Sequence, residues 1–117
     1  MKVAVIGSRN IMIDNIGDFL PDGTTELVSG GAAGVDTCAK KYAVEHGIRL
    51  TEFLPDYKRY KRGAPLKRNM QIIEYADTVI AFWDGRSRGT EHVINECKRS
   101  GKGISVYIIS GSESAGK

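Results

Sequence analysis

Five short apolar runs recur along the chain, and helical patterns separate most of them. The runs are VAVIG from Val3, ELVSG from Glu26, RLTEFLP from Arg49, TVIAFWDG from Thr78 and ISVYIIS from Ile104. Strands that alternate with helices are typical of βαβ units, whose strands lie parallel in one sheet covered by helices. This alternation predicts an α/β fold with a mostly parallel sheet.

The polarity of each run indicates its place in the sheet. The first, fourth and fifth runs are nearly continuous apolar segments, as expected for parallel strands covered on both faces. The third run, from Arg49, is more polar and fits an edge strand. The segment between the first two runs is short and weakly periodic, and a helix is expected there.

Three further helices are expected from apolar residues at helical spacing and from their end signals. The first ends at Gly47, the second opens at Pro65, and the third ends at Gly101. Their apolar stripes are, in order, Val35, Cys38, Ala39, Tyr42 and Ala43; then Leu66, Met70, Ile73 and Ala76; then Val93, Ile94 and Cys97.

Length and composition place the chain among small globular proteins. Its 117 residues suggest one domain over residues 1–110 and a polar, flexible tail over residues 111–117. The first apolar run is too short for a signal peptide or a membrane span, so a cytoplasmic protein with no membrane association is expected. Cys38 and Cys97 lack metal-ligand spacing and are expected to be buried thiols in a reducing cytosol. The formal net charge of +3 is too small to indicate nucleic acid by itself.

Three of the expected strands end in polar residues that lead toward a helix. These ends read GSRN from Gly7, SGGAAGVD from Ser29 and WDGRSRGTE from Trp83. In a parallel sheet covered by helices, ligands bind at the carboxyl ends of the strands, near the point where the strand order reverses. Helix N-termini there present free N–H groups and partial positive charge. Each end is therefore a candidate anion site.

The loop SGGAAGVD has the glycine spacing G-G-x-x-G. The dinucleotide fingerprint G-x-G-x-x-G would need glycine at Ser29 and follows the first strand of its unit, so the match fails. The residues alone leave two interpretations open, a phosphate cradle and a tight turn between strand and helix. The tail GSESAGK has the glycine and lysine spacing of a P-loop but lacks the Ser or Thr and the helix that a P-loop needs, so no P-loop is expected.

A basic segment, DYKRYKRGAPLKRN from Asp56, follows the third run. Its cations are Lys58, Arg59, Lys61, Arg62, Lys67 and Arg68. Tyr57 and Tyr60 are interleaved with them and could stack on a base. The segment is either a solvated loop or a surface that attracts a phosphate-bearing ligand.

The end of the fourth run, WDGRSRGTEH, adds groups that suit phosphate. Arginine can bind phosphate through two parallel hydrogen bonds, and the hydroxyl of Thr90 lies near an expected helix start. Trp83 could instead cap the core, and His92 fits a surface position on a helix. The sequence shows no nucleophile–His–Asp set and no cluster with metal-ligand spacing, so neither a metal nor a cofactor is expected.

The ordered motifs VIGSR, VSGGAAGVD, KRGAPLKRN and FWDGRSRGT resemble the SLOG superfamily. That superfamily groups small Rossmann-like YspA-type proteins with the LOG cytokinin-activating enzymes and the DNA-processing protein DprA. The resemblance covers Val3 to about Ile109 and is nearest to the YspA-type branch. It implies a three-layer α/β Rossmann-like sandwich, a five-stranded parallel sheet of order 3-2-1-4-5, and a pocket for a nucleotide or nucleotide derivative.

The resemblance also implies a homodimer formed through helices beside the pocket. The helix from Pro65 to Ala76 is the candidate, because Met70, Ile72, Ile73 and Tyr75 give it more apolar surface than one buried stripe needs.

Matched to the motifs of the family, the resemblance implies a ligand- or phosphate-binding set at the strand ends. The set is Gly7, Ser8, Arg9, Gly30, Gly31, Gly34, Asp36, Arg68, Asn69, Asp84, Gly85, Ser87, Gly89 and Thr90. Phosphate is expected over the turns at Gly30–Gly31 and Gly89–Thr90, with charge supplied by Arg9 and Arg68.

The sequence departs from the LOG enzymes at one position. LOG phosphoribohydrolases carry P-G-G-x-G-T-x-x-E, whose glutamate contributes to cleaving the bond between base and ribose. Here Gly89-Thr90 is followed by Glu91, His92 and Val93, so an apolar residue stands in the place of the glutamate.

Three functions therefore compete. The first is binding of a nucleotide or phosphoribosyl small molecule by a free-standing SLOG domain. The second is N-glycosidic hydrolysis of nucleoside monophosphates, with Glu91 or Asp84 as the acidic group. The third is DprA-like binding of single-stranded nucleic acid by the basic segment. Val93 argues against hydrolysis, and the modest net charge argues against nucleic acid.

Overall fold

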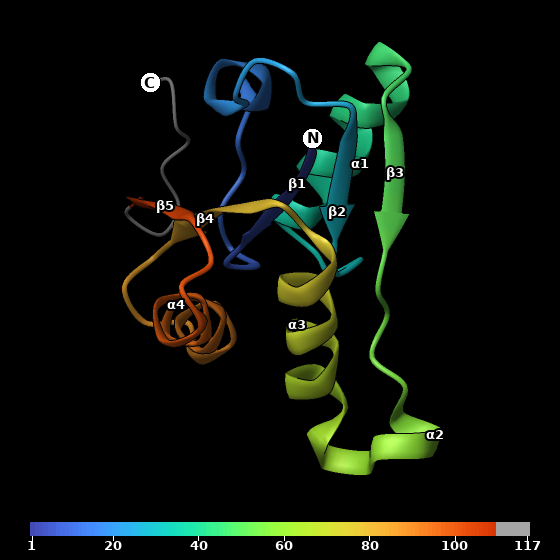
Figure 1. Ribbon diagram of the computed structural model, residues 1–117, viewed down its shortest axis with the longest axis vertical. Coiled ribbons are helices and arrows are strands. Elements are labelled where there is room, and N and C mark those ends of the chain that lie inside the picture. The colour runs from blue at the N-terminus through green and yellow to red at the C-terminus, as the bar shows by residue number, and fades with distance from the viewer. Residues whose placement is uncertain (110–117) are drawn as a thin grey trace.

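A five-stranded sheet forms the centre of the fold, and every neighbouring pair of strands is parallel (Figure 1). The computed structural model describes residues 1–109. The strands are β1 (Lys2–Gly7), β2 (Glu26–Ser29), β3 (Arg49–Glu52), β4 (Thr78–Trp83) and β5 (Ile104–Ile108), in the order β3-β2-β1-β4-β5. The expected Rossmann-like α/β arrangement and strand order are confirmed. The GSESAGK motif lies outside the described residues.

Helices cover the two faces of the sheet. They are α1 (Val35–His46), the short α2 (Tyr57–Tyr60), α3 (Ala64–Tyr75) and α4 (Arg88–Ser100), with 3₁₀ turns η1 (Ile16–Phe19) and η2 (Lys61–Gly63). Gly47 and Gly101 end α1 and α4 in left-handed conformations, as the sequence predicts. No helix within residues 1–109 combines the length and hydropathy that crossing a bilayer requires.

The core divides into two clusters because successive strand residues point to opposite faces of the sheet. Val3 and Val5 of β1 pack with α1 and η1 on one face. Ala4 and Ile6 pack with α3 and α4 on the other. The helices on either side of β1 therefore belong to different layers, which is what opens a crevice at the ends of the strands.

The expectation that β5 is buried is wrong. The run that forms β5 was expected to be covered on both faces, but within residues 1–109 β5 pairs with β4 alone, and Val106, Tyr107 and Ile108 are exposed. An apolar run does not by itself distinguish a central strand from an edge strand. The more polar β3 is the other edge of the sheet, as expected.

The buried face of α3 also differs from the expected stripe. Leu66 is 48% exposed and Met70 37% exposed, whereas Ile72 and Ile73 are buried together with the polar Asn69. Because the buried face includes a polar residue, the spacing of apolar residues does not predict which face of α3 is buried. Of the surplus apolar surface proposed for dimer formation, Ile72 and Ile73 belong to the core.

The expected pair of buried thiols is half correct. Cys97 is buried, but Cys38 is only partly buried, and its Sγ accepts a hydrogen bond from the amide of Ile13 at 3.3 Å. Both cysteines are free.

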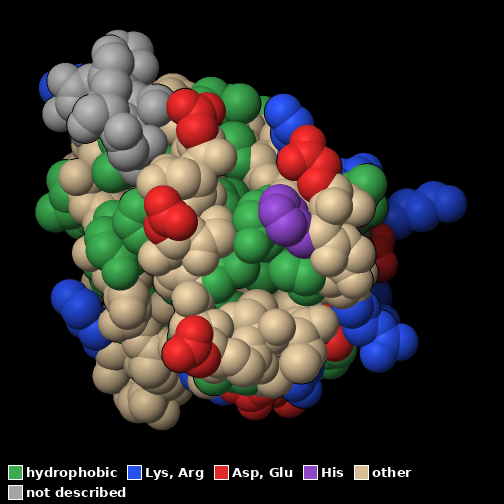
Figure 2. All heavy atoms as spheres, turned by 90° about the horizontal axis from the view of Figure 1, so that it is seen from above, with side chains coloured by type: hydrophobic (Ala, Val, Ile, Leu, Met, Phe, Trp, Pro, Cys, Tyr) green, Lys and Arg blue, Asp and Glu red, His purple; other side chains and the backbone are tan. Residues whose placement is uncertain are grey.

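Charge is distributed unevenly between the two ends of the molecule. The exposed cations Lys58, Arg59, Lys61 and Arg62 lie on α2 and η2, beyond the carboxyl ends of the strands (Figure 1). Figure 2 shows the opposite end, where acidic side chains lie between hydrophobic ones and Lys and Arg side chains lie mainly at the rim.

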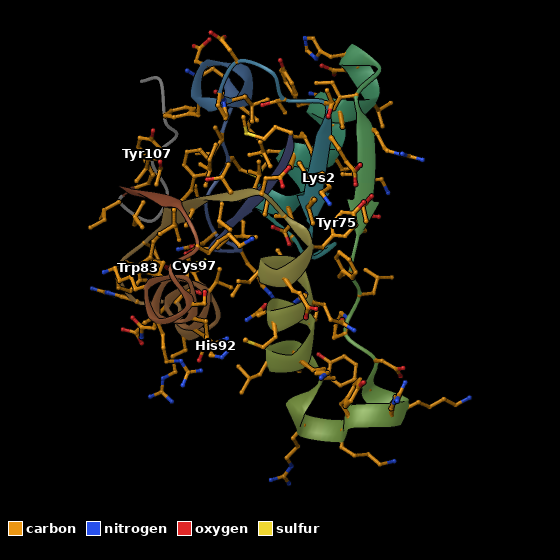
Figure 3. All side chains as sticks on the ribbon, viewed as in Figure 1. Lys2, Tyr75, Trp83, His92, Cys97 and Tyr107 are labelled. Atoms are coloured by element: carbon orange, nitrogen blue, oxygen red, sulfur yellow. The ribbon has the colours of Figure 1, made fainter. Side chains whose placement is uncertain are left out.

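A buried carboxylate ties the amino-terminal ends of the strands to α3. Glu26, which is 6% exposed, accepts hydrogen bonds from the hydroxyls of Tyr75 at 2.5 Å and Thr51 at 2.7 Å. These hydrogen bonds, that of Tyr75 first, lower the pKa of Glu26. The ammonium of Lys2 lies 4.2 Å from the centre of the Tyr75 ring, and Figure 3 shows the two side chains next to each other.

We expect Tyr75→Phe to lower the free energy of unfolding by about 1–2 kcal/mol at pH 7, because the Glu26 carboxylate loses one hydrogen bond. A lowered folded-state pKa gives stability that is present above the unfolded pKa of glutamate, about 4.3, and is lost as pH falls through the folded value. The cost of the substitution should therefore shrink below pH 4 in urea unfolding. Tyr107→Phe, at an exposed tyrosine, is the control, and an equal cost for both variants at pH 7 would contradict the role of Glu26.

Candidate functional site

A cavity of about 450 Å³ lies at the carboxyl ends of β1, β2 and β4. The chain winds outward from β1 in one direction through β2 and β3, and in the other through β4 and β5. The cavity is thus at the reversal point of the sheet, where ligands bind in folds of this type. It is lined by Ile6, Gly7, Ser8, Arg9, Asn10, Gly30, Ala32, Asp36, Pro65, Leu66, Arg68, Asn69, Ile72, Asp84, Ser87, Gly89, Thr90 and Val93.

Most residues of the predicted binding set line this cavity, but Gly31, Gly34 and Gly85 do not. These three glycines have positive φ angles of 69°, 71° and 81°, so they are residues of the turns around the cavity. A Cβ on Gly34 would lie 2.4 Å from the carbonyl oxygen of Arg9. Glycine at position 34 therefore allows the start of α1 to approach the loop after β1.

Several lining residues were absent from the predicted set. Asn10 directly follows the predicted GSR motif, so its position next to that motif was an available signal. Leu66 and Ile72 come from α3, whose orientation the sequence did not resolve. Ile6, Ala32, Pro65 and Val93 are apolar residues that carry no signal of a site on their own.

The glycine loop uses its own backbone amides. The amide of Gly31 donates to Ser29 Oγ at 3.2 Å, and the amide of Ala32 donates to Asp36 Oδ2 at 3.1 Å. A phosphate over Gly30 and Gly31 would have to displace these contacts and would face a carboxylate. The loop geometry is that of a tight turn organised around Asp36.

Asp36 is a buried carboxylate in the cavity wall. It is 6% exposed, and its Oδ1 has no hydrogen-bond partner among the described residues. Burial raises the pKa of Asp36, and the Ala32 amide and the nearby charge of Arg68 oppose that shift. A destabilised titratable group in a cavity is typical of functional sites.

Arg68 reaches across the cavity from the first turns of α3. Its Nη1 donates to the carbonyl oxygen of Gly30 at 2.7 Å, and its Nε donates to Asn69 Oδ1 at 3.0 Å. Burial lowers the pKa of the Arg68 guanidinium, and the charge of Asp36 opposes the shift. Arginine remains protonated in proteins, so Arg68 is a fixed positive charge at the cavity. Arg9, which is exposed, adds a second cation to the lining.

The N-terminus of α4 opens toward the same cavity. Its first backbone hydrogen bond runs from the amide of Glu91 to the carbonyl of Ser87, at 3.1 Å. The amides of Arg88, Gly89 and Thr90 therefore have no partner within the helix. A Cβ on Gly89 would meet no atom within 4 Å, so the backbone at Gly89 is accessible from the cavity.

The turn between β4 and α4 is held by Asp84. Its Oδ1 accepts hydrogen bonds from the amides of Ser87 at 2.7 Å and Arg86 at 2.8 Å, and these bonds lower its pKa. The amide of Asp84 donates in turn to Ser8 Oγ at 3.2 Å, which joins the ends of β4 and β1. A carboxylate with a lowered pKa is a poor proton donor. Asp84 Oδ1, the Asp84 amide and Ser8 Oγ thus hold the two loops together.

The other acidic candidate and the valine in the LOG motif are both placed by the structure. Glu91 is exposed and does not line the cavity. Val93 is 2% exposed and forms part of the cavity wall. Within residues 1–109, no group of three or more His, Cys, Asp or Glu side chains is arranged to hold a metal ion.

A Rossmann-like domain with a cavity at its reversal point defines the class of this protein, and comparison with known sequences gives its family. The chain belongs to the YspA, cpYpsA-related SLOG family, whose model matches residues 1–60. It is also similar to the Gene 61 protein of Mycobacterium phage D29, with 33% identity over 81 residues. That match covers 64% of this chain and 65% of the phage protein. No solved structure gives a significant match.

We expect Asp36→Asn to increase stability at pH 7. A raised folded-state pKa gives stability that is present below the unfolded pKa of aspartate, about 3.9, and is lost as pH rises through the folded value. Asparagine keeps a carbonyl acceptor for the Ala32 amide and avoids burial of a charge. The gain over wild type should therefore grow from pH 4 to pH 7 in urea unfolding.

The matched control is Asp22→Asn at an exposed aspartate, which should change stability little at either pH. If Asp36→Asn is less stable than wild type at pH 7, the hydrogen bonds to the carboxylate outweigh its burial and the interpretation of Asp36 is wrong.

Proposed function

We propose that the cavity binds a nucleotide or a nucleotide-derived phosphoribosyl molecule without cleaving it. The observation that carries this proposal is the accessible N-terminus of α4 in a cavity that Arg68 also lines, at the reversal point of the sheet. A helix N-terminus and an arginine together supply oriented N–H donors and positive charge, which are the requirements for binding a phosphate. The cavity volume of about 450 Å³ is within the range of small-molecule sites.

In this proposal the phosphate lies at Gly89 and Thr90 and not over the glycine loop. The amides of α4 are free within the helix, whereas those of Gly31 and Ala32 already have partners. Arg68 and Arg9 supply the neutralising charge. Arg68 still has N–H groups beyond the two that contact Gly30 and Asn69, since a guanidinium carries five.

The rest of the cavity suits a nucleoside. Leu66, Ile72 and Val93 form apolar wall against which a base can pack. The carboxylates of Asp36 and Asp84 offer acceptors for ribose hydroxyls. An arrangement of apolar walls with a few polar groups is typical of small-molecule sites.

The side chains in and near the cavity are poorly suited to hydrolysis of a nucleotide. Val93 cannot stabilise the positive charge that develops on a ribose when its bond to the base breaks. Two backbone amides donate to Asp84 and lower its pKa, and Glu91 lies outside the cavity. This supports binding over LOG-like N-glycosidic cleavage.

Single-stranded nucleic acid is the second candidate, and one observation favours it. The cations of α2 and η2 are exposed, and Tyr57 at the start of α2 is 55% exposed and could stack on a base. Tyr60 is less available, because Arg59 and Lys67 lie 5.3 Å and 5.6 Å from its ring centre. Such binding would weaken steeply with salt, whereas binding of a mononucleotide would depend on salt less.

A homodimer through α3 also stays a proposal. Leu66 and Met70 are the exposed apolar residues of that helix, and light scattering of the protein at micromolar concentration tests the assembly directly. A monomer mass would contradict it.

The proposed function is tested by a thermal-shift screen with nucleoside mono-, di- and triphosphates, dinucleotides, cyclic nucleotides and a single-stranded oligonucleotide. A bound compound raises the melting temperature by mass action. We expect a shift with at least one nucleotide. Absence of a shift with every nucleotide at millimolar concentration would contradict the proposal.

We expect Gly89→Val to weaken binding of the responding nucleotide about tenfold to a hundredfold, because the side chain would occupy the space of the phosphate. Folding should be preserved, since Gly89 does not have a positive φ and its Cβ would meet no atom within 4 Å. Gly63→Val is the matched control, because Gly63 has φ −80°, equally open surroundings and no place in the cavity. Equal calorimetric affinities for the two variants would remove the α4 N-terminus from the site.

A further inference from the structure

A chain of side-chain contacts runs from the cavity to the surface between α3 and α4. Arg68 Nε donates to Asn69 Oδ1 at 3.0 Å, and Asn69 Nδ2 lies 3.2 Å from His92 Nδ1. Asn69 Nδ2 also donates to the carbonyl of Gly89 at 3.4 Å. On the far side of the ring, His92 Nε2 lies 3.8 Å from Glu96 Oε1, and Glu96 contacts Arg99. Figure 3 shows His92 on the side of α4 that faces α3.

The hydrogen-bonding capacities of Arg68 and of the Gly89 carbonyl determine the orientation of the Asn69 amide and the tautomer of His92. Arginine can only donate hydrogen bonds, so the atom of Asn69 that faces Arg68 must be the oxygen. A backbone carbonyl can only accept, so the atom that faces Gly89 must be the nitrogen of the amide. His92 Nδ1 faces that same nitrogen and must therefore accept from it. The ring proton of neutral His92 is consequently on Nε2, directed toward Glu96.

Protonation of His92 is incompatible with this arrangement. A proton on Nδ1 would place a donor against the donor Nδ2 of Asn69. Asn69 is only 6% exposed, so water cannot easily supply alternative partners. If the side-chain amide of Asn69 flips, its oxygen can accept from protonated His92. The NH₂ group of Asn69 then faces the donor Arg68 Nε, and the Gly89 carbonyl loses its donor.

The charged groups around His92 act in opposite directions. Glu96, on α4, favours the protonated ring, and Arg99 reduces this effect because it contacts the same carboxylate. From α3, Arg68 disfavours the protonated ring through its contact with Asn69. Protonated His92 and Arg68 would therefore compete for the side-chain oxygen of Asn69.

We propose that His92 is a positioning residue that orients Arg68 over the cavity through Asn69, and that protonation of His92 breaks the hydrogen bond between Arg68 and Asn69 and weakens the binding of phosphate. The second half of this proposal rests on the proposed function, because it concerns affinity at the same cavity. The first half concerns the protein alone and is measured without a ligand.

The ligand-free test is nuclear magnetic resonance of the isotopically labelled full chain between pH 8 and pH 5. We expect the Nε2–H tautomer of His92 at pH 8, and a shift of the Arg68 Nε–H signal with the same midpoint as the His92 ring. His46→Gln separates the two histidine signals. The Nδ1–H tautomer, or an Arg68 signal that does not follow the titration of His92, would overturn the proposal.

Two variants distinguish positioning from a merely structural role. Asn69→Asp offers an acceptor to both neighbours and adds a negative charge, so it should raise the pKa of His92. His92→Gln keeps an acceptor for Asn69 but cannot titrate, so the Arg68 signal should lose its pH dependence. If Asn69→Asp leaves the pKa of His92 unchanged, the contact between the two residues does not control the ring.

The binding test uses adenosine 5′-monophosphate and calorimetry at pH 8 and pH 5.5. The phosphate itself takes up a proton near pH 6, but it does so equally for wild type and His92→Gln. Wild type should lose about fivefold more affinity than His92→Gln as the pH falls, and equal losses would overturn the effect on binding. No binding of adenosine 5′-monophosphate to wild type at pH 8 would exclude this nucleotide as the ligand and overturn the effect on its binding, and the resonance experiment then decides the positioning role by itself.

Discussion

The close packing of β1 against β4 is the constraint on which the rest of the structure depends. Gly7 makes it possible, because a Cβ there would lie 2.5 Å from the Phe82 carbonyl and 2.6 Å from Val35 Cγ2. Because Gly7 has no side chain, Phe82 of β4 and Val35 in the first turn of α1 can both pack closely against the end of β1. The connections from β1 and β4 then lead to opposite layers, and the cavity is the space between them.

Two internal carboxylates occupy backbone amides around this space. Asp36 organises the glycine loop and Asp84 organises the turn after β4, so the amides of both loops already have acceptors. The first amides of α4 have no partner within the helix, and Gly89 and Arg68 line the same cavity. Carboxylates thus occupy amides at the ends of β2 and β4, whereas the first amides of α4, which follows β4, have no partner within the helix. Burial raises the pKa of Asp36, and carboxyl groups perturbed in this way inside a cavity are common at functional sites.

The fold was largely predictable from local patterns. Apolar runs and end signals such as Gly47 and Gly101 depend on neighbours in the sequence, and the structure confirms them. The strand order came from the family resemblance, and it brought the polar strand ends to one cavity. Whether a given residue contacts a ligand depends on side-chain geometry that no pattern carries. Gly31 and Asp36 both belonged to the predicted set, but Gly31 is a turn residue and the Asp36 carboxylate accepts from the loop where phosphate was expected.

Other features could not be predicted because they depend on contacts between distant segments. The orientation of α3 follows from Asn69, a polar residue that is buried because Arg68, Gly89 and His92 satisfy its amide. His92 looked like a surface residue because its partner Asn69 lies 23 positions away. The exposure of β5 follows from its place at the edge of the sheet, which the composition of the strand does not encode.

The most direct test of the account is a titration of the ¹⁵N-labelled protein with adenosine 5′-monophosphate, followed through the backbone amide signals. The account predicts that the largest shifts occur at Arg88, Gly89 and Thr90, with smaller shifts in residues 7–10 and 30–32. Shifts confined to α2 and η2, or no shifts at millimolar nucleotide, would contradict the claim that the α4 N-terminus holds the phosphate.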